Sequence, residues 1–422
     1  MNFTSRTGKR RVVITGAGAI TPVGNSVEEF WESLLEGRSG TGEITTFDYT
    51  KTNVSLAAEV KDFNPKDHFD HKEIRRTDKA TRLGIVAARQ AFENSGLDFT
   101  EYDPYMMGIM YGSGIGGYNA IEEEILNYAA SDRNPRNISP FFIPKYISNM
   151  TPGKIAMEYP IFGDNMTVTT ACASSTHAIG EAFHKIANGY LDMALAGGSE
   201  STVTETAVVA FDNMTALSRN QDPETASRPF DQDRDGFLMG EGAVLLVLET
   251  LEGAVKRGAN ILAEITGYGA TTDGYHITSP DPTGKGDSAA IKKAIKDAGL
   301  TADDIDYFNA HGTSTPLNEK YEVIALKKAL GERASQIPIT SIKGNTGHLL
   351  GAAGAAEALA SALILQTGII PKTRGTQNLD PEFDVDVVFG ENRETDAKIA
   401  LSNNLGFGGQ NGVLVIEKYE GK

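Results

Sequence analysis

An internal repeat is the feature of this chain that most restricts its fold. The segment ITGAGAIT at 14–21 and the segment ITGYGATT at 265–272 agree at six of eight positions, with an offset of 251 residues. Each copy predicts a short strand that runs into a glycine turn, and each half closes on a similar buried strand, AVLLVLE at 243–249 and GVLVIE at 412–417. The sequence therefore predicts a duplicated fold.

Between these landmarks, short apolar runs alternate with helical patterns. Examples of such runs are 106–111, 166–170 and 305–309, and this alternation is typical of layered α/β architecture. No low-complexity linker divides the chain, so we expect the two halves, 1–260 and 261–422, to pack into one body.

Composition restricts the environment and the partners. The chain has 422 residues, is 40% hydrophobic and carries a net charge of −17, which predicts a globular protein that binds neither nucleic acid nor an anionic membrane. Cys172 is the single cysteine, so an internal disulfide and a zinc site of several thiolates are excluded. We expect no signal peptide and no transmembrane helix, and we predict a cytoplasmic protein.

One basic cluster stands out against the acidic background. In HKEIRRTDKATR the cations recur at spacings of three, one, three and three, which on one helix would form a stripe. The alternatives are a solvated helix face and a docking strip for an anionic partner. The stripe consists of Lys72, Arg75, Arg76, Lys79 and Arg82.

Two short motifs imitate cofactor sites. GSGIGG at 112–117 has the glycine spacing of a dinucleotide site, but Asp132, the acidic residue at the required distance, lies in a polar loop instead of at the end of a strand. DQDRDGFLMGE at 231–241 imitates a calcium loop, yet the twelfth, bidentate position is Gly242. We therefore predict no cofactor and no metal.

Cys172 lies in VTTACASSTHAIG, between a β-branched strand and a helical pattern that ends at Gly189. At such a turn the thiol faces the free N–H groups and the positive end of a helix dipole. Both effects lower the pKa of a thiol, so the sequence predicts a reactive cysteine instead of an unreactive structural residue of the core.

The second half supplies polar partners for this thiol. His311 follows a buried strand in YFNAHGTSTPLNE, and His348 begins a small-residue helix, five residues after Lys343. Phe407 lies among glycines in NNLGFGGQNG, where a flexible backbone can direct an N–H toward a developing oxyanion.

Together, TACASSTHAIG, NAHGTSTPLNE, KGNTGHLLGAAGAAEA and NNLGFGGQN resemble the β-ketoacyl-acyl carrier protein synthases of the thiolase fold, over essentially the whole chain. They are most similar to the elongating class of type II fatty acid synthesis. The resemblance implies an α/β thiolase-like duplicated fold, a five-layer αβαβα sandwich of two pseudo-repeated halves, which usually forms a homodimer. It also implies an acidic acyl carrier protein as partner, which favours the docking interpretation of the basic stripe.

The resemblance also implies a role for individual residues. Cys172 would carry the acyl chain, and His311 and His348 would stabilise the enolate of malonyl decarboxylation. Lys343 and Glu357 would form a charged pair near the second histidine, His348. The backbone N–H groups of Cys172 and Phe407 would form the oxyanion hole. Thr313 and Thr315 would bind pantetheine, and further positions that line the substrate pocket would be Ile115, Phe211, Phe407, His276 and Thr278.

Some positions depart from the family pattern. Glu319 stands where aspartate is usual, so the resemblance does not fix the geometry of any cation site there. Gln410 replaces threonine or histidine, and Asn404 and Leu405 replace the serine and phenylalanine of NSF, which implies a different pocket shape near Phe407.

Several alternatives can be compared with this interpretation. A degradative thiolase needs a second cysteine, which this chain lacks. Initiating synthases use Cys-His-Asn, whereas the motifs here contain two histidines. A chain-length-factor subunit lacks the cysteine that this chain has. The α subunit of a type II polyketide synthase has the same chemistry and stays open. Two alternatives come from other classes of protein. A dehydrogenase that used GSGIGG would bind a nicotinamide cofactor, and a non-catalytic scaffold protein would have an unreactive Cys172 sulfur.

Overall fold

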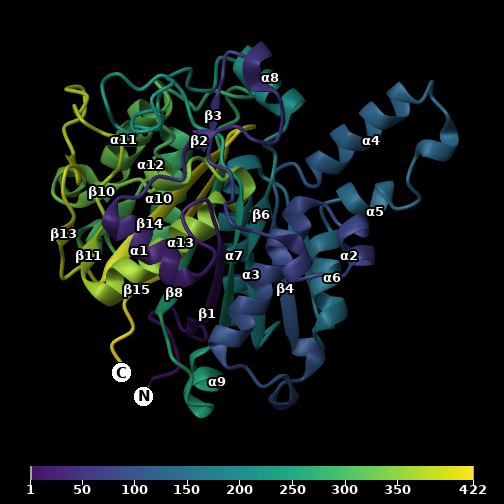
Figure 1. Cartoon of the computed structure of the whole chain (residues 1–422). Coiled ribbons are helices and arrows are strands. Elements are labelled where there is room, and N and C mark those ends of the chain that lie inside the picture. The colour runs from purple at the N-terminus through teal and green to yellow at the C-terminus, as the bar shows by residue number, and fades with distance from the viewer. Residues whose placement is uncertain (1, 422) are drawn as a thin grey trace.

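An 11-stranded sheet runs through the molecule in the computed structural model, which describes residues 2–421 (Figure 1). The strand order is β12-β10-β9-β14-β15-β8-β1-β7-β6-β4-β5. The strands of the first half are β1 (Val12–Ile20), β4 (Met107–Gly112), β5 (Asn165–Val168), β6 (Met193–Glu200) and β7 (Gly242–Thr250). Those of the second half are β8 (Ala263–Thr272), β9 (Tyr307–Asn309), β10 (Pro338–Thr340), β12 (Asp386–Val387), β14 (Ile399–Gly406) and β15 (Gln410–Glu417).

The strand pairing repeats on the two sides of the sheet centre. β1 and β8 meet antiparallel over three residue pairs, and the order β1-β7-β6-β4-β5 on one side corresponds to β8-β15-β14-β9-β10 on the other. On both sides the first two pairings are antiparallel and the next two are parallel. The predicted duplicated α/β fold is confirmed.

The glycines of the repeat lie inside strands β1 and β8, so the predicted glycine turns were wrong. A Cβ added at Gly18 would lie 1.9 Å from the carbonyl oxygen of Ala87, and one at Gly269 would lie 2.0 Å from that of Ala290. Ala87 belongs to α3 (Lys79–Ser95) and Ala290 to α10 (Lys285–Asp297). In both copies, glycine therefore allows a helix to approach the strand closely.

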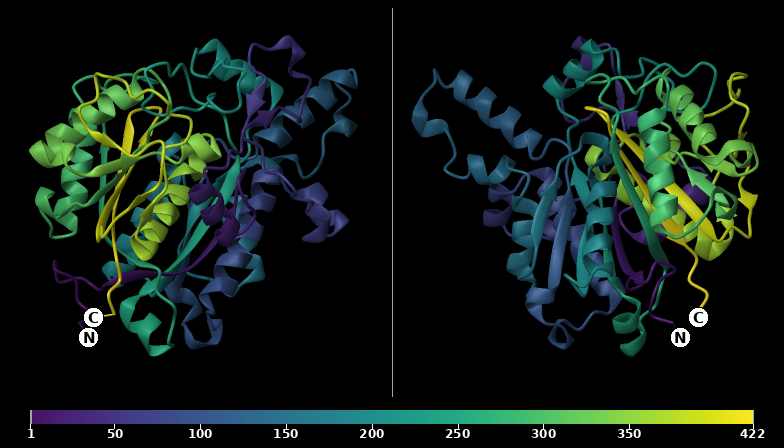
Figure 2. Two further views of the ribbon diagram at one scale, coloured as in Figure 1. Left: turned by 60° about the vertical axis from the view of Figure 1, so that its left-hand side comes forward. Right: turned by 180° about the vertical axis from the view of Figure 1, so that it is seen from behind.

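Five layers follow from the positions of the helices (Figure 2). α7 (Ser174–Ala187) and α13 (Ala353–Thr367) lie between the two halves of the sheet and contact strands of both. α3 covers β1 and β7 from one outer side, while α10, itself packed against α11 (Asn318–Leu330), covers β8 and β15 from the other. α13 is buried on all sides because its sequence is apolar around the whole circumference. Residues 350–367 are long and apolar enough to cross a membrane, but 89% of this window is buried inside the protein, as in a core helix.

The remaining elements connect or flank these layers. The other helices are α1 (Val27–Glu36), α2 (His71–Arg76), α4 (Tyr118–Ala130), α5 (Phe142–Tyr146), α6 (Met150–Glu158), α8 (Glu205–Asn213), α9 (Leu251–Lys256) and α12 (Lys343–Thr346). The short strands are β2 (Gly42–Glu43), β3 (Leu56–Ala57), β11 (Ile369–Ile370) and β13 (Arg393–Glu394). α4 and α5 form an arm that projects from the body (Figure 1). The expected boundary near residue 260 falls in the loop between α9 and β8.

The basic stripe does not lie on one helix, so that prediction was wrong. α2 ends at Arg76 and α3 begins at Lys79, because Asp78 is extended and caps α3 through the backbone N–H of Ala80. Lys79 forms an ion pair with the buried Glu241, and Arg82 donates to backbone carbonyl oxygens at the end of α2. The exposed cations that remain are Lys72, Arg75 and Arg76.

Candidate active site

Cys172 lies in a single 3-10 turn between a strand and a helix. β5 ends at Val168, four residues before the cysteine, and α7 begins at Ser174. Ala171 has a φ of 50°, a left-handed conformation that is strained for a residue with a Cβ. The Ser174 hydroxyl donates to the Ala171 carbonyl at 2.6 Å and accepts from the Thr170 N–H at 2.9 Å, and these bonds hold the turn in place.

The two histidines come from two loops of the second half. His311 follows β9, and its backbone N–H donates to Glu322 of α11 at 2.6 Å. His348 follows α12 and Gly347, which has a φ of 64°, and the His348 N–H donates to the carbonyl of Leu238 at 2.7 Å. Both rings are buried.

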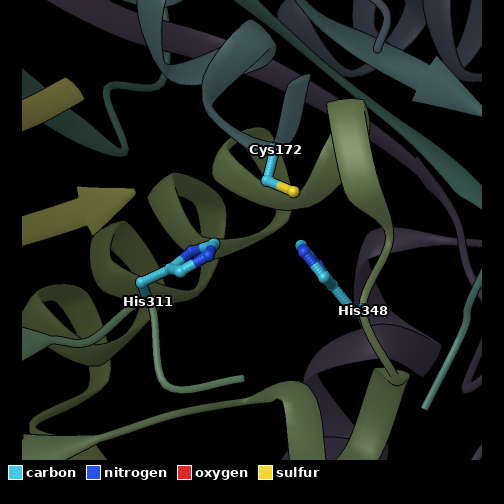
Figure 3. Close-up of side chains that lie close together, drawn as sticks. All are labelled: Cys172, His311 and His348. Atoms are coloured by element: carbon cyan, nitrogen blue, oxygen red, sulfur yellow. The ribbon is translucent and has the colours of Figure 1, made fainter. Parts of the chain in front are cut away.

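Figure 3 shows both rings directed toward the sulfur. Cys172 Sγ and one ring nitrogen from each of His311 and His348 lie within 4.8 Å of one another. The two ring centroids are 5.4 Å apart and their planes are at 82°. Among residues 2–421, these three side chains are the one group of at least three His, Cys, Asp or Glu residues whose ligand atoms lie close enough together to hold a metal ion. Equally, a carbonyl oxygen placed between the rings would meet two donors beside a nucleophile.

Lys343 and Glu357 form a buried ion pair behind the histidines. Lys343 Nζ also donates to the backbone carbonyl of His311 and lies 3.5 Å from its Nδ1. The charged pair was expected near His348, the second histidine. In the structure, Lys343 of this pair contacts His311, the first histidine.

Asn404 is a site residue whose contacts the sequence analysis missed. Its Nδ2 lies 2.6 Å from Glu357 Oε2 and 3.3 Å from His311 Nδ1. Its Oδ1 accepts from the Thr176 hydroxyl on α7 at 2.5 Å. The departure from serine at position 404 was the signal that could have pointed to it.

Burial raises the pKa of the Cys172 thiol to about 12. The Lys343 charge and hydrogen bonds from the backbone N–H groups of Phe407 and Cys172 act in the opposite direction but are weaker, and Glu200 adds to the rise. The prediction of a lowered thiol pKa was therefore wrong, because desolvation outweighs the helix terminus. The resting nucleophile is a thiol.

The same burial lowers the pKa of both histidines well below the usual range, and the nearby Lys343 charge adds to this effect. Both imidazoles are therefore neutral at physiological pH. A neutral imidazole donates from one ring nitrogen only, so the function of each ring depends on which nitrogen carries the proton.

A cavity of about 460 Å³ opens onto these groups. It is lined by Cys172, His311 and His348 together with most of the predicted substrate residues, namely Ile115, Phe211, Thr278, Thr313, Thr315 and Phe407. The backbone N–H groups that oppose the rise in the Cys172 pKa are those of Phe407 and Cys172, the two groups predicted for the oxyanion hole. His276 is not among the residues that line this cavity: its ring is exposed and accepts from the backbone N–H groups of Thr278 and Ser279 within its own loop.

Phe237, which the sequence analysis did not single out, also lines the cavity. The centroid of its ring lies 5.3 Å from that of His348, with the ring planes at 83°, and 5.5 Å from that of Phe211, with the planes at 80°. It therefore fixes the His348 ring from the apolar side. The sequence signal was hidden because Phe237 lies inside the segment that imitates a calcium loop.

The glycine loop at 112–117 binds an internal carboxylate. Glu200, at the end of β6, accepts from the N–H of Gly114 at 2.6 Å and of Ile115 at 3.3 Å. It also accepts from Gly351 in the second half at 3.1 Å. Amides that would otherwise face a phosphate therefore hold Glu200, in agreement with the rejection of a dinucleotide site.

The departures from the family pattern have structural roles. Glu319 is buried and accepts from the N–H groups of Ser314 and Thr315, so it holds the turn that bears the two threonines. Leu405 lines the cavity. The Gln410 side chain lies over Gly408, where an added Cβ would be 2.8 Å from Gln410 Oε1.

Known proteins are similar to this chain over nearly its whole length. Residues 9–254 match the family described as Beta-ketoacyl synthase, N-terminal domain, and residues 262–377 match Beta-ketoacyl synthase, C-terminal domain. The 3-oxoacyl-[acyl-carrier-protein] synthase 2 of Staphylococcus aureus (strain COL) is 47% identical over 411 residues, which cover 97% of this chain and 99% of that relative.

Two solved structures have the same fold. The ishigamide ketosynthase/chain length factor has a TM-score of 0.91 at 35% identity and covers 97% of this chain and 100% of its own. A type II polyketide ketosynthase in complex with its acyl carrier protein has a TM-score of 0.91 at 29% identity, with 98% and 100% covered. With the family match, the full-length relative and the thiol between two neutral imidazoles, the chain belongs to the β-ketoacyl synthase family of acyltransferases.

Proposed function

We propose that this enzyme elongates an acyl chain by two carbons, through decarboxylative condensation with a malonyl group on acyl carrier protein, in type II fatty acid synthesis. The observation that carries the proposal is the Cys172 thiol between two neutral imidazoles at the end of an apolar cavity. The 47% identity to a relative of this activity supports the choice within the family.

In the first step, the Cys172 sulfur attacks the thioester carbon of an acyl carrier protein. The new S–C bond forms as the bond to the pantetheine sulfur breaks, and the thiol proton leaves with the pantetheine. The backbone N–H groups of Cys172 and Phe407 stabilise the negative oxygen of the intermediate. Because burial keeps Cys172 protonated, the proton leaves as the attack proceeds and not before it.

In the second step, a malonyl thioester replaces the first carrier and its oxygen lies between the histidines. Loss of carbon dioxide leaves an enolate, which His311 and His348 stabilise by donating from the nitrogens that face the cavity. The enolate carbon then attacks the acyl group on Cys172, the new C–C bond forms as the bond to the cysteine sulfur breaks, and the resulting thiolate takes up one proton from solvent. The product is a 3-oxoacyl thioester.

The polar and apolar parts of the cavity wall support different positions for the two parts of the substrate, the pantetheine arm and the acyl chain. Thr313 and Thr315 line the cavity with their hydroxyls 3.0 Å apart, as a polar site for the amides of the pantetheine arm. Ile115, Phe211 and Phe407 form the apolar part, which would take the acyl chain.

The carrier protein would dock on the exposed cations Lys72, Arg75 and Arg76. A strongly acidic carrier needs a local cationic surface on an enzyme of charge −17. The Arg76 guanidinium lies 4.5 Å above the Phe141 ring, which fixes one of these charges. A structural relative solved with its carrier protein supports this kind of partner.

A homodimer is proposed on the side of β5. β5 is the last strand of the sheet within residues 2–421, and Met166 on it is 51% exposed. On the α4–α5 arm, Ile125, Leu126 and Ile143 are also more than half exposed. An unpaired strand edge next to apolar side chains is suited to a second copy of the chain. We further propose that the enzyme works in the cytoplasm.

The second candidate is the ketosynthase α subunit of a type II polyketide synthase, because structural relatives of that kind have TM-scores of 0.91. Their sequence identities, 35% and 29%, are below the 47% of the fatty acid relative. The deciding experiment gives the purified chain acyl- and malonyl-carrier protein. We expect elongated 3-oxoacyl product from this chain alone, and activity only after addition of a second, homologous subunit would favour the polyketide role.

A further inference from the structure

Two buried groups approach the ring nitrogen of His311 that does not face the cavity. These groups belong to Asn404 and Lys343, and Glu357 lies behind them, paired with both; all three side chains are nine-tenths buried or more. Asn404 Nδ2 lies 3.3 Å and Lys343 Nζ lies 3.5 Å from His311 Nδ1. Which of these groups donates decides where the ring proton lies.

The orientation of the Asn404 amide follows from its other two contacts. Glu357, which is paired with Lys343, lies 2.6 Å from Nδ2 and accepts there, so this end of the amide carries the N–H groups. On the other side, the Thr176 hydroxyl donates to Oδ1 at 2.5 Å. One Asn404 N–H is therefore directed to Glu357, and the second is available to His311.

The nitrogen Nδ1 therefore faces only donors. An ammonium group has no lone pair to offer, and the Asn404 nitrogen has none either. A proton on Nδ1 would meet these N–H groups head on, whereas a lone pair on Nδ1 accepts from them. A neutral imidazole that accepts at Nδ1 carries its proton on Nε2.

We propose that Asn404 is a positioning residue that holds His311 in the tautomer protonated at Nε2, the form that can donate to the thioester oxygen. Asn404 does not touch the cavity and acts through His311 alone. Its bond to Thr176 ties this control to α7, the helix that follows Cys172. The kinetic part of the proposal rests on the proposed function, while the tautomer does not.

Two variants and a matched control test the proposal. Asn404→Ala removes one of the two donors, and Asn404→Asp puts an acceptor of nearly the same shape in its place. The control is Asn403→Ala, which removes a fully buried amide from the adjacent position of β14, where it contacts Glu322 at 2.9 Å and not the His311 ring.

The direct readout is nitrogen NMR of histidine-labelled protein, with the His311 signals assigned by their loss in His311→Ala. We expect the Nε2–H tautomer in the unchanged protein and in Asn403→Ala, a mixture in Asn404→Ala, and the Nδ1–H tautomer in Asn404→Asp. If both Asn404 variants keep the Nε2–H tautomer, the proposal is overturned.

The kinetic readout separates the two half-reactions. We expect malonyl decarboxylation to fall about tenfold in Asn404→Ala, where Lys343 still donates, and about a hundredfold in Asn404→Asp, with acyl transfer to Cys172 within about twofold. Equal losses in both steps would indicate a merely structural role and overturn the proposal. A lack of decarboxylation in the unchanged enzyme would instead overturn the proposed function, and the NMR result would stand.

Discussion

The Glu200 carboxylate accepts a hydrogen bond of 3.1 Å from the backbone N–H of Gly351, and this contact joins the two halves of the fold beside the active site. Glu200 also holds Gly114 and Ile115, so one buried side chain fixes the cavity wall of the first half and the loop after His348 in the second.

Replacement of Glu200 by glutamine should change how stability depends on pH. Burial raises the pKa of Glu200 to about 7 from an ordinary value of 4.5, although the N–H groups of Gly114, Gly351 and Ile115 oppose the shift. A raised carboxyl pKa gives stability that is full below pH 4.5 and is lost as the pH rises through 7. Relative to Glu200→Gln, the unchanged protein should lose about 3 kcal/mol of unfolding free energy between pH 4.5 and 8. Denaturant titration at both pH values measures this, and parallel curves for the two proteins would contradict it.

Alkylation of Cys172 should be slow at neutral pH and should accelerate steadily with pH. With a thiol pKa of about 12, the thiolate fraction rises tenfold for each pH unit below that value. Iodoacetamide labelling followed by mass spectrometry should show this slope from pH 7 to 9 without a plateau, and prior acylation should block it. A plateau near pH 8 would mean that the thiol is activated in the resting enzyme.

Replacement of either catalytic histidine should affect the two half-reactions unequally. In His311→Ala and His348→Ala, malonyl decarboxylation should fall about a hundredfold to a thousandfold, because in the proposed mechanism each of these neighbouring rings is one of the two side-chain donors to the enolate oxygen. Acyl transfer to Cys172 should persist, since it depends on backbone N–H groups. Release of carbon dioxide and of carrier thiol are measured separately, and equal losses would refute the division of roles.

Removal of one partner of the buried Lys343–Glu357 ion pair should lower the free energy of unfolding more than replacement of both partners by apolar residues. Lys343→Met leaves Glu357 as an uncompensated charge in the core, so we expect a loss of about 3–5 kcal/mol of unfolding free energy. The double variant with Glu357→Leu should recover most of this loss without recovering activity. Thermal unfolding and condensation assays on the same samples separate the two effects.

Charge reversal on α2 should weaken carrier binding. Lys72→Glu with Arg75→Glu should raise the KM for carrier-bound substrates about tenfold or more and leave kcat nearly unchanged, because these exposed cations lie outside the cavity. The matched control is Lys292→Glu with Lys296→Glu, an equal change of charge on exposed positions of α10. If the two pairs raise KM equally, the effect is one of net charge and not of docking.

The sequence predicted the parts of this molecule that local pattern can specify. The repeat predicted the duplication because matching glycines are needed wherever a helix approaches a strand, and the motifs around Cys172, His311 and His348 led to three side chains that meet in space. What could not be predicted depends on burial and on contacts distant in sequence. The raised pKa of Cys172 depends on the depth of the cavity, and the contacts of Asn404 come from three separate elements.

The basic stripe shows the same limit. Its spacing suited one continuous helix, but Asp78 caps a new helix in the middle of it, and Lys79 is used to neutralise Glu241, 162 residues away. Charge pattern alone therefore did not separate cations that hold the fold from cations that face solvent.

The donors behind His311 also bear on resistance to metal poisoning. A thiol and two imidazoles within 4.8 Å of one another are the kind of ligands that Zn²⁺ prefers. A histidine that binds zinc well, however, donates its second ring N–H to an acceptor, and His311 Nδ1 faces the ammonium of Lys343 and the amide N–H of Asn404. The arrangement that directs a ring proton into the cavity therefore also makes the nucleophile and its histidines a poor trap for the cell's free zinc.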